Sequence, residues 1–112
     1  MTSRIPSIFS NNIKKSRKTF ISYLVCGDPS KNDTLIAMKI MADSGVDVIE
    51  LGIPFTDPIA DGPVIQKSID RALKNNISLR DVISVVDKFR KTDKKTAVVL
   101  MGYMNPVHKM GV

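Results

Sequence analysis

Residues 46–62 have the sequence VDVIELGIPFTDPIADG, a short apolar segment followed by a loop rich in glycine and proline. The segment 46–51 has the β-branched composition of a strand. Side chains alternate between the two faces of a strand, so Glu50 shares a face with Val46 and Val48 near the carboxyl end. Ligands of parallel sheets lie at the carboxyl ends of strands, and a carboxyl group in apolar surroundings suits acid–base chemistry. Glu50 is therefore a candidate catalytic residue, or else a strand-end glutamate that reaches solvent or a nearby lysine.

Strands and helices alternate on both sides of this segment. Residues 19–26 (TFISYLVC) and 96–101 (TAVVLM) contain no charged side chain and predict two further strands, the first buried on both faces. Helices are predicted at four places, over an N-terminal segment containing Ile5, Ile8, Phe9 and Ile13, over 33–44, over 63–74, and from Ser78 with Val82, Ile83, Val86 and Phe89 on one face.

Local signals support the helix boundaries. Gly45 suits a C-terminal stop, Pro63 suits a first helical position, and Ser78 with Asp81 resembles a capping box. Strands that alternate with helices pair in parallel through right-handed crossovers, so the sequence predicts an α/β fold. Helices must then cover both sheet faces or the sheet must close into a barrel. A flavodoxin-like sheet is the alternative, although such sheets usually contain five strands and three are predicted here.

Composition narrows the possible functions. The net charge of +6 would permit nucleic-acid binding, but aromatic residues are only 5% and the basic clusters 14–18 and 88–95 fall at predicted helix ends. The single cysteine, Cys26, and the single histidine, His108, have no zinc-ligand spacing around them, and Cys26 is expected to be a buried thiol. No apolar run approaches the ~20 residues of a membrane helix, and the N-terminus does not resemble a secretory signal.

Two aspartates in the loop are further candidates. Asp61 directly precedes Gly62-Pro63 and is expected either to cap the following helix or to act as a permanent anion beside Glu50. Asp57 stands in an Asp-Pro pair, which is ordinary turn chemistry.

Fourteen consecutive residues, 49–62, resemble the signature of the tryptophan synthase alpha chain. Gly27-Asp28-Pro29, the residues just after Gly62 and the stretch 101–105 are also similar to this family. The resemblance covers essentially the whole chain and places it at the N-terminus of the family.

The resemblance implies a fold and an activity. Residues 1–112 would be the N-terminal portion of a single TIM (β/α)8-barrel domain, an incomplete barrel with about three strands. The family enzyme is a cytoplasmic lyase of tryptophan biosynthesis that cleaves indole-3-glycerol phosphate to indole and glyceraldehyde 3-phosphate. It needs no metal or organic cofactor, because PLP belongs to the beta chain that receives the indole in an α2β2 heterotetramer.

The resemblance also implies roles for individual residues. Glu50 matches the carboxylate that transfers protons, and Asp61 matches the carboxylate that faces the indole nitrogen. Asp57 and Pro58 match loop positions that communicate with the beta chain. The positions that match the surroundings of the substrate are Tyr23, Ile65, Met101 and Tyr103, with Tyr23 standing where phenylalanine is familiar.

The phosphate site sets a limit on activity. In such barrels it is built from the loops after strands 7 and 8, which the 112 residues do not contain, so we expect the chain by itself to be inactive. Two other functions remain open, a catalytically inactive fragment that docks a beta chain through Asp57 and Pro58, and a basic nucleic-acid-binding protein.

Overall fold

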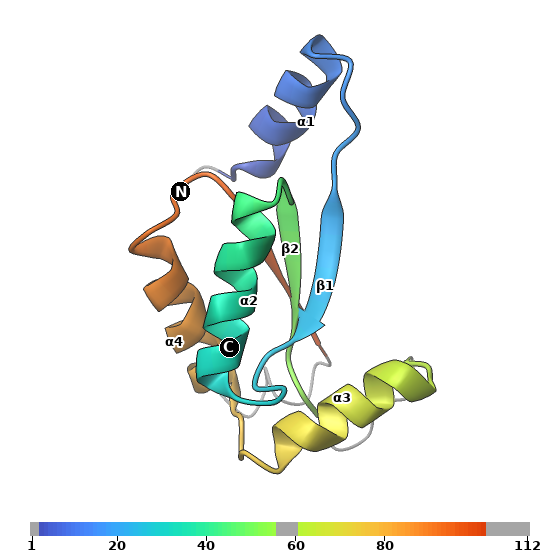
Figure 1. Cartoon of the computed structure of the whole chain (residues 1–112), viewed down its shortest axis with the longest axis vertical. Coiled ribbons are helices and arrows are strands. Elements are labelled where there is room, and N and C mark those ends of the chain that lie inside the picture. The colour runs from blue at the N-terminus through green and yellow to red at the C-terminus, as the bar shows by residue number, and fades with distance from the viewer. Residues whose placement is uncertain (1–2, 56–60, 103–112) are drawn as a thin grey trace.

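The computed structural model describes residues 3–55 and 61–102 of the chain. Three parallel strands form one sheet in the order β1-β2-β3, which confirms the predicted α/β organisation (Figure 1). The strands are β1 (Ile21–Val25), β2 (Val48–Gly52) and β3 (Ala97–Met101), and the helices are α1 (Ile5–Lys14), α2 (Lys31–Asp43), α3 (Pro63–Leu73) and α4 (Leu79–Arg90).

Strand β2 occupies the centre of the sheet and places Glu50 between two neighbours. The register pairs Glu50 with Tyr23 of β1 and with Val99 of β3. Paired residues of parallel strands point to the same face, so these three side chains form one row. The strand continues to Gly52, one residue beyond the prediction, because the Gly52 carbonyl accepts a hydrogen bond from the Cys26 N–H at 2.9 Å. Glu50 is consequently the third of five strand residues.

Helices α2 and α4 pack together on one face of this sheet (Figure 1). Ile49 and Leu51 of β2 belong to the core that these helices cover, and both are fully buried. Helix α4 buries Val82, Val85 and Phe89, whereas Ile83 is 44% exposed, so its predicted place on the buried face was wrong. Successive residues of an α-helix lie about 100° apart, and the position after Val82 therefore turns away from the sheet.

The opposite face, which carries Tyr23 and Glu50, is more open. Residues 19–26 were predicted to be buried on both faces, but Ile21 is 46% exposed and Tyr23 is half-buried, so that prediction was wrong. In a closed barrel this face is the interior and is covered by strands from the other side. The described residues form three strands, and the face remains partly accessible.

Two edges of the sheet are occupied by different helices. Helix α1 lies at the amino edge, where the strands begin, and α3 crosses the carboxyl edge, where β1 and β2 end (Figure 1). The predicted boundaries are confirmed by Gly45 at φ +102° after α2, by Pro63 as the first residue of α3, and by a Ser78–Asp81 capping box on α4. Basic residues fall in the last turns of α1 and α4, as the sequence indicated.

The described part of the chain contains no helix that combines the length and the apolar character of a membrane span.

Candidate functional site

Glu50 is the only glutamate among the eleven acidic residues of the chain. It lies half-buried on β2 between the buried Val48 and Gly52, which share its face. Within the described ranges, no hydrogen bond or ion pair occupies its carboxylate. The carboxylate thus lies on the open face of the sheet, and a group in such a position can be reached by a ligand, which is the first condition for acid–base chemistry.

Tyr23 adjoins Glu50 on the neighbouring strand, as the register shows. Its ring extends over Gly52, because a Cβ built at that glycine would overlap the phenol of Tyr23. Gly52 therefore leaves the space in which the aromatic ring lies across the carboxyl end of β2. The structure brings two of the predicted site residues together, Glu50 and Tyr23.

Asp61 stands at the beginning of α3. Gly62 is the N-cap residue and no side chain caps the helix there, so the alternative in which Asp61 is the capping residue was wrong. Proline at the first helical position fixes the cap one residue after Asp61. The Asp61 main-chain carbonyl accepts a hydrogen bond from Gln66 Nε2 at 2.6 Å, which ties this residue to the first turn of α3.

The remaining predicted site residues are dispersed. Met101 ends β3 opposite Gly52 on the face of Glu50 and is 54% exposed. Ile65, in the first turn of α3, is partly buried and packs against the hydrophobic core. Asp57, Pro58 and Tyr103 lie outside the described residues.

A polar cluster at the carboxyl edge was missed by sequence reasoning. Asp28, in the turn after β1, accepts two hydrogen bonds from Arg71 of α3, from Nε to Oδ1 at 2.7 Å and from Nη2 to Oδ2 at 3.0 Å. The hydrogen bond from Arg71 holds the pKa of the Asp28 carboxyl below its usual value. The signal in the sequence was Gly27-Asp28-Pro29, which predicts a turn but gives no indication of a partner on α3.

Cys26 precedes this turn and is fully buried, as predicted. Burial raises the pKa of its thiol to about 11, which keeps it protonated at neutral pH. The described residues contain no group of three or more side chains suited to hold a metal ion.

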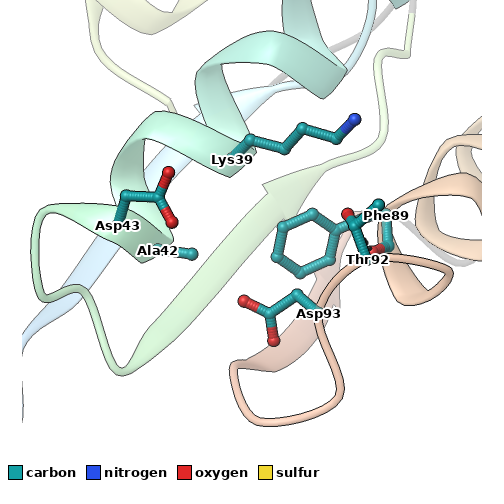
Figure 2. Close-up of a pocket in the computed structure, with 6 residues that line it drawn as sticks. All are labelled: Lys39, Ala42, Asp43, Phe89, Thr92 and Asp93. Carbon is teal, nitrogen blue, oxygen red and sulfur yellow. Dashed lines mark hydrogen bonds between the residues drawn. The ribbon is translucent and has the colours of Figure 1, made fainter.

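A pocket of about 180 Å³ lies at the opposite, amino edge, and Figure 2 shows α2 on one side of it and the end of α4 on the other. Its Asp93 carboxylate accepts hydrogen bonds from the Lys95 and Thr96 N–H groups, both at 2.8 Å, and therefore serves the loop before β3. The pocket is not part of the Glu50 face. The residues that line it are Lys39, Ala42, Asp43, Phe89, Thr92 and Asp93.

The family model for the tryptophan synthase alpha chain matches residues 9–112. The chain belongs to the tryptophan synthase alpha chain family. The tryptophan synthase alpha chain of Neisseria gonorrhoeae is 61% identical over 94 residues, which cover 84% of this chain and 36% of that protein.

Solved structures of this family have the same fold. The crystal structure of tryptophan synthase subunit alpha from Legionella pneumophila superposes with a TM-score of 0.96 at 43% identity, covering 99% of this chain and 42% of that one. The tryptophan synthase complex from Pyrococcus furiosus gives a TM-score of 0.77 at 46% identity over 83% of this chain and 38% of that one. The chain thus spans about two fifths of the length of these alpha chains, and its three strands are an N-terminal part of their TIM barrel.

Proposed function

We propose that this chain is the catalytic N-terminal part of a lyase of tryptophan biosynthesis, which cleaves indole-3-glycerol phosphate into indole and glyceraldehyde 3-phosphate. The observation that carries the proposal is the position of Glu50, the only glutamate, beside Tyr23 on the sheet face that is the interior of a barrel. Residues 1–112 would form the N-terminal portion of one barrel domain in the cytoplasm. The match of residues 9–112 to the alpha chain family supports this assignment.

Cleavage requires proton transfer at two places on the substrate. Glu50, acting as an acid, protonates the indole ring carbon that bears the side chain, and positive charge develops on the ring nitrogen. The Asp61 carboxylate stabilises that charge. Glu50, acting as a base, then accepts the proton of the hydroxyl on the adjacent side-chain carbon. The carbon–carbon bond breaks, its electron pair returns to the ring to give indole, and the hydroxyl carbon becomes the aldehyde.

The proposed substrate pocket uses four residues around these carboxylates. Tyr23, Met101 and Tyr103 would surround the indole ring, and Ile65 would lie near the glyceryl end. The proximity of Tyr23 to Glu50 and the exposed position of Met101 on the same face support this arrangement. Ile65 would act from the rim, since it also packs against the core.

The proposed partner is a tryptophan synthase beta chain, which would receive the indole and carry the PLP. The loop with Asp57 and Pro58 would contact that chain in an α2β2 complex, such as the a2b2 complex named for the relative from Pyrococcus furiosus. The alpha chain itself would need no cofactor. The alternative is an inactive module that binds the beta chain through the same loop, since the 112 residues lack the loops after strands 7 and 8.

A barrel-length chimera tests the proposed activity. In it, residues 1–112 are continued by the remainder of the Legionella pneumophila subunit, whose first part superposes on nearly the whole of this chain. We expect the chimera to release indole from indole-3-glycerol phosphate and the 112-residue chain alone to release none. Glu50→Gln keeps the shape of the side chain but cannot transfer protons, so kcat should fall by about 10²- to 10⁴-fold with little change in KM.

Asp70→Asn is the matched control, because Asp70 is an exposed carboxylate of α3 that was not predicted to take part in the site. That variant should keep the wild-type rate, and circular dichroism should show all chimeras folded. A folded Glu50→Gln chimera with the wild-type kcat would refute the role of Glu50. A folded wild-type chimera that binds the beta chain but releases no indole would instead support the interaction module.

A further inference from the structure

The turn between β1 and α2 is held by side chains that come from α3. The Arg71 guanidinium donates two parallel hydrogen bonds to the Asp28 carboxylate, and Ser68 Oγ donates a third to Asp28 Oδ2. The Asp28 side chain is only 14% exposed. Paired N–H groups on one carboxylate fix direction as well as distance, so this contact sets the position of α3 relative to the turn.

The same turn is also held through its backbone. Asn75 Nδ2, just beyond the end of α3, donates to the carbonyls of Gly27 at 3.0 Å and Pro29 at 2.6 Å. Thr34 Oγ1 of α2 accepts the Gly27 N–H at 2.9 Å. Gly27 has φ +91°, and a Cβ there would overlap Ile77, so the turn requires glycine at this position. The turn therefore joins β1, α2 and α3 into one rigid unit.

The other end of α3 carries Asp61. Gln66 Nε2 donates to the Asp61 main-chain carbonyl at 2.6 Å, and Gly62 is the N-cap of the helix. An α-helix rises about 1.5 Å per residue and bends little over two turns. Contacts that fix Ser68 and Arg71 therefore also fix the N-terminus of α3, with Asp61 beside it.

We infer that Asp28 is a positioning residue for Asp61, which it holds in place through Arg71, Ser68 and the rigid body of α3. The expected effect on turnover rests on the proposed function. The structural part, that Asp28 fixes the position of α3, can be tested without any activity. Asp47 provides a matched control, because this aspartate is similarly buried, at 17% exposure, but binds residues at the amino edge.

The structural test is hydrogen–deuterium exchange of the barrel-length chimera, which needs no activity. Asp28→Asn removes the charge that Arg71 recognises and should speed the exchange of amides in residues 64–73 by about tenfold to a hundredfold. Asp47→Asn should speed exchange at the start of β1 and leave α3 closer to the wild type. Equal protection of α3 in the two variants would overturn the inference, and so would unprotected α3 amides in the unsubstituted chimera.

The kinetic test uses the barrel-length chimera. Because a small displacement of a group acting in the transition state lowers kcat more than substrate affinity, Asp28→Asn should lower kcat about tenfold to a hundredfold and change KM little. Arg71→Lys keeps the charge without the paired N–H groups and should restore part of the rate lost in Arg71→Gln. Faster exchange in α3 with an unchanged kcat would overturn the positioning role, whereas an inactive wild-type chimera with faster exchange would contradict only the proposed function.

Discussion

The amino and carboxyl edges of the sheet each contain a partly buried aspartate, but the two aspartates bind different kinds of partner. At the amino edge, Asp47 Oδ2 accepts the Phe20 N–H at 2.9 Å and a hydrogen bond from Asn12 of α1 at 3.3 Å. At the carboxyl edge, Asp28 binds Arg71 and Ser68 of α3. Asp47 joins the beginnings of two strands, whereas Asp28 joins a strand end to the helix that follows Asp61.

We expect this difference to separate stability from function along the strands. In barrels the amino ends chiefly serve stability and the carboxyl ends carry the chemistry. The hydrogen bonds of Asp47 hold the amino edge together. Asn12, which donates to Asp47, also donates to Thr19 Oγ1 at 3.0 Å. The carboxyl edge combines a rigid turn with the accessible face of Glu50. Substitutions at the two edges should therefore have different consequences.

The largest effect in this comparison is expected at Asp61. In the barrel-length chimera, Asp61→Asn removes the charge that we propose to stabilise the developing indole cation, so kcat should fall about 10²- to 10³-fold. The variant should remain folded, because Gly62 and not Asp61 is the N-cap residue of α3. Indole release and circular dichroism measure both quantities. A folded Asp61→Asn chimera that keeps its kcat would refute the role of Asp61 as the second carboxylate of the mechanism.

A smaller effect is expected in the pH dependence of the stability that Asp28 contributes. The hydrogen bond from Arg71 lowers the pKa of Asp28 in the folded chain, so its ionised form stabilises the fold above its unfolded pKa of about 3.9. This contribution is lost as the pH falls from about 3.9 through the lower pKa of the folded state. The difference in free energy of unfolding between wild type and Asp28→Asn should therefore be constant above about pH 5 and shrink in more acidic solution.

Urea unfolding at a series of pH values, with the barrel-length chimera and its Asp28→Asn variant, measures this difference. A difference that grows as the solution becomes more acidic would have the wrong sign for a carboxylate with a lowered pKa. Such a result would mean that the Asp28–Arg71 contact does not stabilise the folded protein through the ionised carboxylate.

The comparison of the edges also shows what the sequence could and could not predict. The strands followed from apolar composition, and the capping box from Ser78 and Asp81, because these signals involve neighbours in the chain. The Asp28–Arg71 contact joins residues 43 positions apart, and neither residue carries a local sign of its partner. Ile83 was misplaced because each helical residue turns by about 100°, so the position after Val82 falls at the margin of the buried face, where it is 44% exposed. The position of Glu50 on the face of Val48 could be predicted, because side chains alternate along a strand, whereas its role stays a prediction.

The smallest effect is expected at Ser78, which lies at the N-terminus of α4 rather than on α3. Ser78 Oγ accepts the Asp81 N–H at 3.3 Å, and Lys31 of α2 donates to Asp81 at 3.2 Å. This polar group joins α2 to α4, and none of the hydrogen bonds described for it reaches α3 or Asp61. Ser78→Ala should therefore cost about 1 kcal/mol of stability, the usual value of a lost N-cap.

In the chimera, Ser78→Ala should leave kcat unchanged, in contrast to Asp28→Asn. Urea unfolding and indole release measure the two quantities, and Ser78→Asn, which restores a capping side chain, should regain most of the stability. A reduced kcat in Ser78→Ala would mean that any loosening of the helix N-termini slows turnover. The positioning role of Asp28 would then be refuted. Loss of the cap of α4 would have slowed turnover as much as loss of the Asp28 contact that holds α3.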